Sequence, residues 1–112
     1  MKGGRDYEDY LVDILDATEK IAAFISGMTE SQFRADDKTQ FAVVRGLEII
    51  DEAAKKIPDT ARAKYPQVPW REIAGMRDKL VHDYIGVNAQ VVWKTAARDV
   101  PEIAELLRAI KR

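Results

Sequence analysis

Residues 7–25, YEDYLVDILDATEKIAAFI, decide the fold class of this chain. With about 100° of rotation per residue, the apolar side chains of this stretch fall within about 80° of one direction. The residues on this face are Tyr7, Tyr10, Leu11, Ile14, Leu15, Thr18, Ile21, Ala22 and Ile25. Such a stripe predicts a long amphipathic helix that buries one face, and Gly27 is expected to end it.

A second long helix is predicted over residues 38–57. Asp36-Asp37 offers its N-terminus, and Pro58 is expected to end it because proline cannot continue a helix. The inward side carries Ala42, Val43, Gly46, Ile49, Ile50, Ala53 and Ile57. This helical period makes it the second long helix of the chain.

The remaining segments also carry helix signals. A capping box at Thr29 and Gln32 predicts one short helical turn, and another is expected between Pro58 and Pro66. A third helix is predicted from Trp70 to Tyr84, with Gly86 ending it. Two more are expected to follow, one capped by Asn88 and one opened by Asp99 and Pro101. No segment alternates like a strand. We therefore expect an all-α, up-and-down bundle of four to five helices, in one domain over residues 1–112 with residues 1–5 as a loose N-terminus.

Composition limits the chemistry. The 112 residues include no cysteine and one histidine, which excludes thiolate metal sites and leaves little for an all-protein transition-metal site. A net charge of −1 excludes the strongly basic surface of a non-specific nucleic-acid binder. The sequence has no nucleotide-binding glycine motif and no metal-binding histidine pair, so we expect no cofactor and no metal. No apolar run could span a bilayer, so we expect no membrane partner and a cytoplasmic protein.

The outer side of the second helix carries apolar residues that a solvated helix face does not need. Phe41 and Val44 lie there among charged residues, and apolar residues on a polar face can mark a partner surface. A bundle helix that touches neighbours on two sides explains the pattern equally well.

The third helix carries the candidate chemistry. Arg77 is centred on its apolar face, within about 60° of Trp70, Ile73, Ala74, Leu80, Val81 and Tyr84. A buried guanidinium needs a carboxylate such as Glu48, a cleft or an interface. His82 is the only imidazole, and Asp78, one turn before it, could orient the ring or be an ordinary surface neighbour. Arg77 and His82 point about 140° apart in a regular helix, so they could serve one reacting atom only if the helix loosens before Gly86 or a second chain contributes, and we interpret this as a sign of a dimer.

Other candidates are weaker. The acidic pairs Asp36-Asp37 and Asp51-Glu52 could hold a divalent ion, but caps and solvated helix faces explain such pairs more often. Trp70 and Trp93 are interpreted as packing residues before base-stacking platforms.

The segment RDKLVHDY at residues 77–84 is arginine, four residues, histidine, one residue, tyrosine, and it resembles the motif of the HEPN superfamily. WREIAGM at 70–76, IGVN at 85–88, VVRGLEIIDEAAKKI at 43–57, Asp9-Tyr10-Leu11 and DKTQ at 37–40 resemble its HepT branch. The resemblance covers about residues 7–110. Asp78 stands where many relatives have asparagine, which changes local charge and hydrogen-bond donors.

The resemblance implies a ribonuclease toxin of a toxin–antitoxin pair that cleaves RNA, tRNA among the candidates, without a metal and as a homodimer. Arg77 and His82 would be catalytic, with Asp78 in support. The partner would be a minimal nucleotidyltransferase antitoxin that adds AMP to Tyr84. Two alternatives stay open: a non-catalytic helical partner of a nucleotidyltransferase, and a purely structural dimerisation bundle.

Overall fold

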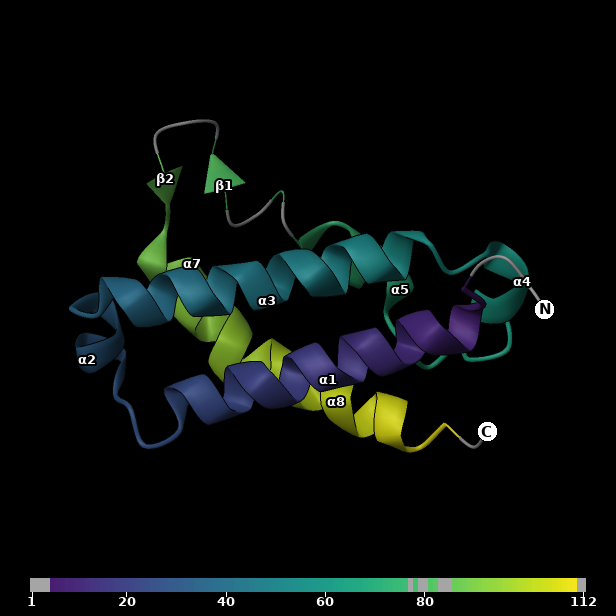
Figure 1. Ribbon diagram of the computed structural model, residues 1–112, viewed down its shortest axis with the longest axis horizontal. Helices are drawn as coiled ribbons and strands as arrows, with labels where there is room; N and C mark the ends of the chain where they lie inside the picture. Colours follow the sequence, from purple (N-terminus) through teal and green to yellow (C-terminus); the bar gives the residue numbers. More distant parts are fainter. Residues whose placement is uncertain (1–4, 77, 79–80, 83–85, 111–112) are drawn as a thin grey trace.

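The computed structural model describes residues 5–76, 78, 81–82 and 86–110, and at 81–82 and 86–87 it describes the backbone alone. The elements, labelled as in Figure 1, are α1 (Tyr7–Ile25), α2 (Glu30–Arg34), α3 (Asp37–Lys55), α4 (Asp59–Arg62), α5 (Trp70–Ala74), β1 (Val81–His82), β2 (Gly86–Val87), α7 (Ala89–Lys94), η1 (Thr95–Asp99) and α8 (Val100–Arg108).

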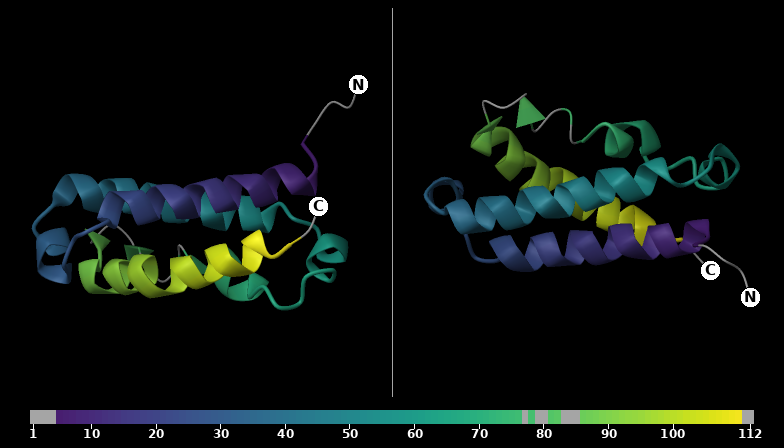
Figure 2. Two further views of the ribbon diagram at one scale, coloured as in Figure 1. Left: turned by 90° about the horizontal axis from the view of Figure 1, so that it is seen from below. Right: turned by 45° about the horizontal axis from the view of Figure 1, so that its top comes forward.

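Helices α1 and α3 form the centre of the molecule. They run antiparallel and side by side, with α8 packed along α1 and α5 against α3 (Figures 1 and 2). The core contains Leu11, Ile14, Ala17 and Ile21 from α1 and Val43, Leu47, Ile50, Ala53 and Ala54 from α3. Gly46 allows the close approach, because a Cβ atom there would lie 2.8 Å from Ile21 Cγ1. The two predicted long helices are therefore confirmed.

The predicted caps of the first helices are confirmed. The Thr29 hydroxyl accepts from the Gln32 amide at 3.1 Å, and the Gln32 side chain accepts from the Thr29 amide at 2.9 Å. Asp36 caps α3 by accepting from the Thr39 amide at 3.0 Å. Gly27 follows α1 with φ 78°, a left-handed conformation that glycine adopts without steric cost.

The C-terminal helices begin where the sequence predicts. Asn88 caps α7, and α8 begins at Val100 with Pro101 in its first turn. The chain continues from α7 through the π-helical turn η1 into α8, and Asp99 makes no side-chain cap. A π-turn widens the helix, which accommodates the missing N–H of Pro101 and the clash of its ring with the preceding turn.

The predicted continuous helix from Trp70 to Tyr84 is wrong. Helix α5 ends at Ala74 with Gly75 as its C-cap, and β1 pairs antiparallel with β2, Val81 opposite Val87 and His82 opposite Gly86. Glycine weakens a helix by roughly 0.5–1 kcal/mol relative to alanine, and the β-branched Val81 and Val87 favour extended backbone.

The expected all-α bundle is confirmed, with this two-residue ladder as its one exception among the described residues. Within the same residues, no helix has the length and apolar character needed to cross a bilayer.

Candidate functional site

The candidate site lies on the chain between α5 and α7, and the first anchor of that chain is α5. Ile73 and Met76 are buried in the core, and the Trp70 indole N–H donates to the Tyr65 carbonyl at 3.1 Å. Trp70 is 8% exposed, so its predicted packing role is confirmed. The chain is thus anchored in the core up to Met76, directly before the motif.

The second anchor is the start of α7. The Asn88 side-chain oxygen accepts from the amides of Gln90 at 3.0 Å and Val91 at 3.2 Å. One turn later Val92 is fully buried, and the Trp93 ring lies 5.4 Å from the ring of Phe33, which confirms packing as the role of Trp93. The motif segment is therefore held at both ends by helices of the core.

Between the anchors, β1 and β2 rise beside the N-terminal half of α3 (Figures 1 and 2). The backbone of His82 lies in β1 opposite Gly86. Asp78 is exposed, and its amide donates to the Gly75 carbonyl at 3.2 Å. Arg77 and Tyr84, the other two predicted site residues, lie outside the described residues.

Among the residues that the structure describes, the groups with shifted pKa values lie outside the motif segment. Hydrogen bonds from the Thr39 amide and hydroxyl lower the pKa of Asp36. A hydrogen bond with the Tyr7 side chain raises the pKa of Tyr65. These groups cap a helix or join α1 to the loop after α4, so they serve the fold.

The two acidic pairs differ from each other. Asp36 is a helix cap, as expected. Asp51 does not lie on a solvated face: it is 1% exposed on the inner side of α3, and its carboxylate lies 3.1 Å from Lys55 Nζ. Its helical neighbours Leu47 and Ala54 are buried, which is the signal that the sequence interpretation passed over. Within the described part of the chain, no three acidic or histidine side chains gather as metal ligands.

The outer side of α3 is exposed as the sequence suggested. Phe41 is 81% exposed, and with Gln40, Val44, Arg45 and Glu48 it lines a hollow of about 280 Å³. A bundle helix covered on two sides would bury Phe41, so the partner-surface interpretation is the better one for this residue.

Comparison with known proteins assigns the family. The family model described as "Ribonuclease HepT-like" matches residues 14–110. The chain belongs to the HepT-like ribonuclease family. Its place there makes it an RNA-cleaving enzyme, and the ribonuclease expected from the motif is confirmed at this level.

Three relatives are similar to this HepT-like chain over most of its length. It is 50% identical over 99 residues to "Probable ribonuclease HepT" of Thermococcus cleftensis, covering 88% of this chain and 90% of the relative. It is 48% identical to "Putative RNase MJ1216" of Methanocaldococcus jannaschii, with 88% and 82% covered. It is 43% identical to "Putative RNase TTE0752" of Caldanaerobacter subterraneus, with 90% of each covered. No solved structure matches the chain significantly.

Proposed function

We propose that this protein is a metal-independent endoribonuclease, the cytoplasmic toxin of a toxin–antitoxin pair, whose site combines Arg77 and His82 in a homodimer. One observation carries the proposal: the motif arginine, histidine and tyrosine are all present at residues 77–84, inside the region that matches the ribonuclease family. The chain has no other histidine, so an imidazole-dependent cleavage has one candidate.

The reaction is an internal transesterification at phosphorus. A base takes the proton of a ribose 2′-hydroxyl, and the 2′-oxygen forms a bond to the neighbouring phosphorus. The bond from phosphorus to the 5′-oxygen breaks, and an acid gives that oxygen a proton. The products are a 2′,3′-cyclic phosphate and a 5′-hydroxyl, with no redox change and no co-reactant.

Each motif side chain has a role in this step. An imidazole takes or gives a proton near neutral pH, and a guanidinium stabilises the negative charge that grows on the phosphate oxygens. One imidazole cannot be base and acid in the same step, whereas two copies of the chain supply two His82 and two Arg77. We assign Asp78, the exposed neighbour of Arg77, to the support of these groups.

The regulation that we propose acts at Tyr84. A nucleotidyltransferase partner would join the tyrosine oxygen to the α-phosphorus of ATP, and pyrophosphate would leave. The added AMP carries negative charge and bulk two residues from His82. Both oppose the binding of an RNA phosphate there.

The decisive experiment is cleavage of labelled RNA, tRNA first, by the purified protein in EDTA. His82→Ala and Arg77→Ala should each lose at least about 100-fold in rate, since general acid–base and electrostatic groups contribute roughly this much. Arg71→Ala is the matched control, because Arg71 is an exposed arginine on α5. Equal cleavage by wild type and His82→Ala would contradict the proposed site.

The regulation has its own test. Incubation with the cognate nucleotidyltransferase and ATP should add the mass of one or more AMP groups to the wild type and none to Tyr84→Phe. Adduct on Tyr84→Phe would place the modification on another residue. Cleavage by neither wild type nor variants would favour a non-catalytic partner of the nucleotidyltransferase.

A further inference from the structure

A groove of about 210 Å³ lies between α5 and α8, and it shares no lining residue with the hollow beside Phe41. Its floor is apolar, because Ile73 and Met76 line it from α5 and the residues after α5, and Ile103 and Leu106 line it from α8. Leu106 is half-buried, whereas the other three are held in the core. In the left view of Figure 2, α5 and α8 lie on the same side of the α1–α3 pair. We call this feature the α5–α8 groove.

The rim of the α5–α8 groove is acidic. Glu72 on α5, Asp99 on η1 and Glu102 on α8 line it, and among the described residues no Lys or Arg does. Within the same residues, none of the three carboxylates forms a salt bridge. Asp99 ends the π-helical turn η1, a type of turn that occurs frequently at functional sites. Three unpaired negative charges around one groove attract a cationic occupant.

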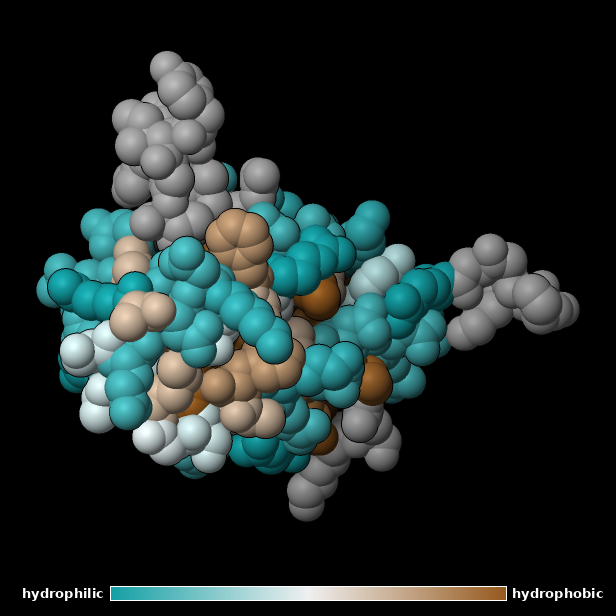
Figure 3. All heavy atoms as spheres, turned by 60° about the vertical axis from the view of Figure 1, so that its left-hand side comes forward, coloured by the Kyte–Doolittle hydropathy of each residue, from teal (hydrophilic) through white to brown (hydrophobic). Residues whose placement is uncertain are grey.

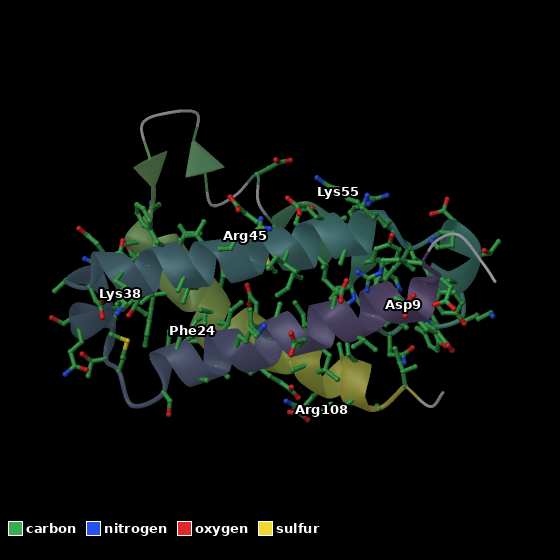
Figure 4. All side chains as sticks on the ribbon, viewed as in Figure 1. Asp9, Phe24, Lys38, Arg45, Lys55 and Arg108 are labelled. Carbon is green, nitrogen blue, oxygen red and sulfur yellow. The ribbon has the colours of Figure 1, made fainter. Side chains whose placement is uncertain are left out.

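Cations elsewhere on the helices already have acidic partners. Figure 4 labels three of these cations, and their pairs are Arg45 with Glu48 at 3.4 Å, Lys55 with Asp51 at 3.1 Å and Arg108 with Glu19 at 3.8 Å. Arg98 precedes Asp99 in the sequence but does not line the α5–α8 groove. The part of the chain that the structure describes therefore supplies no cation to this rim.

The sign of the charge decides between the possible occupants. Apolar residues lie exposed among hydrophilic ones on the face seen in Figure 3, so apolar character by itself does not select an occupant. An RNA backbone needs Lys and Arg to replace its counterions, and the acidic rim repels it. A second copy seated groove to groove would place three carboxylates against three. In the described structure these carboxylates do not gather as metal ligands either.

The occupant that fits is a protein segment that presents Lys or Arg beside apolar side chains. Its apolar side chains would cover the floor of the groove, and its cations would pair with the rim. We propose that the α5–α8 groove is the docking site for such a basic, apolar segment of the nucleotidyltransferase partner. Met76 lines the groove eight residues before Tyr84, so a partner held there is close along the chain to its target. This inference rests on the proposed function, because it adds a docking contact to the enzyme that modifies Tyr84.

The test is the binding of the cognate nucleotidyltransferase to the full chain, with association and dissociation rates measured at low and high salt. Glu102→Lys should weaken binding at least about 10-fold at low salt, mainly through slower association, because rim charges steer the encounter. The difference from wild type should shrink at high salt, where ions screen the charges. Glu105→Lys is the matched control, because Glu105 is an exposed acid on the same helix that does not line the groove. It should change binding less than about 2-fold.

Two milder variants keep the proposal falsifiable if Glu102→Lys folds poorly. Glu102→Gln and Glu72→Gln each remove one charge and keep the size of the side chain, and both should weaken binding in the same direction. In the AMP-addition assay, each should raise the KM for this protein and leave kcat unchanged, because the docking contact lies apart from the reacting tyrosine.

The outcomes separate this inference from the proposed function. If the nucleotidyltransferase binds Glu102→Lys and Glu105→Lys equally, the docking site is overturned and the modification of Tyr84 stands. If the groove variants lose binding while His82-dependent cleavage is absent, the ribonuclease function fails and the docking site stands. If the groove variants bind the partner normally but change RNA cleavage or the oligomeric state, the groove serves RNA or a second copy and the proposal is overturned.

Discussion

The α1–α3 pair and the chain between α5 and α7 are built in opposite ways. In the pair, buried aliphatic residues recur on every turn, and Gly46 lets the helices touch at Ile21. Between Gly75 and Asn88, the described side chains are the buried Met76 and the exposed Asp78, and a two-residue ladder joins the backbone. The pair determines stability, whereas the other region carries the candidate chemistry.

Because of this difference, we expect stability and catalysis to respond to different substitutions. Changes in the buried pair and its neighbours should alter the free energy of unfolding. Changes at the motif should alter RNA cleavage and leave unfolding nearly untouched. Four predictions, in order of decreasing effect, test whether the two regions control stability and RNA cleavage separately.

The largest effect is expected from Phe33→Ala. Phe33 is fully buried and packs on Trp93, so its removal leaves a cavity between α2 and α7. We expect a loss of about 3–5 kcal/mol in the free energy of unfolding, measured by urea titration. Phe24→Ala, at a ring that is 43% exposed, should cost less than about 1 kcal/mol. Equal losses would contradict the placement of the core.

The next effect is expected from Gly46→Val. Its Cβ atom would lie 2.8 Å from the buried Ile21 side chain, so α1 and α3 must separate. Overpacking of this kind costs about 1–3 kcal/mol in thermal or urea unfolding. Gly46→Ala should cost less, because alanine regains about 1 kcal/mol of helix propensity. A valine variant as stable as wild type would show that the pair is looser than described.

A smaller effect is expected from Asn88→Ala, at the boundary between the two regions. The side chain caps α7, and its loss should cost about 1 kcal/mol of stability. RNA cleavage should also fall, because the cap fixes the point where the motif segment rejoins the core. Asn88→Asp keeps the acceptor and should retain both properties. Unchanged cleavage in the alanine variant would show that the segment is positioned without its second anchor.

The smallest effect is expected from Asp36→Asn, and it depends on pH. Hydrogen bonds from Thr39 lower the pKa of Asp36 in the folded state. The ionised cap therefore stabilises the fold above its ordinary pKa of about 3.9, and this contribution is lost as pH falls through the lowered value. Wild type should have the higher melting temperature at pH 7, with the difference shrinking below about pH 4. A constant difference across this range would contradict the assignment.

The sequence determined the elements whose signals are local. The stripe at residues 7–25, the capping box at Thr29 and Gln32, and the caps at Asp36 and Asn88 each depend on side chains within one or two turns. Helical period and capping act over that distance, so a short stretch of sequence is sufficient to predict them. The motif at 77–84 is equally local, and it led to the correct family.

Tertiary structure decided what depends on neighbours far along the chain. The sequence predicted separate helices beginning at Asn88 and Pro101, whereas the π-helical turn η1 joins α7 to α8, and both η1 and α8 pack against α1. Asp51 was interpreted as solvated because its acidic neighbour Glu52 suggested a polar face, although Leu47 and Ala54 on the same side of α3 are apolar, and tertiary packing buries that side. The apolar residues from Trp70 to Tyr84 have a helical period, yet α5 ends at Ala74 and His82 pairs with Gly86, because side-chain periodicity does not show which backbone segments will pair.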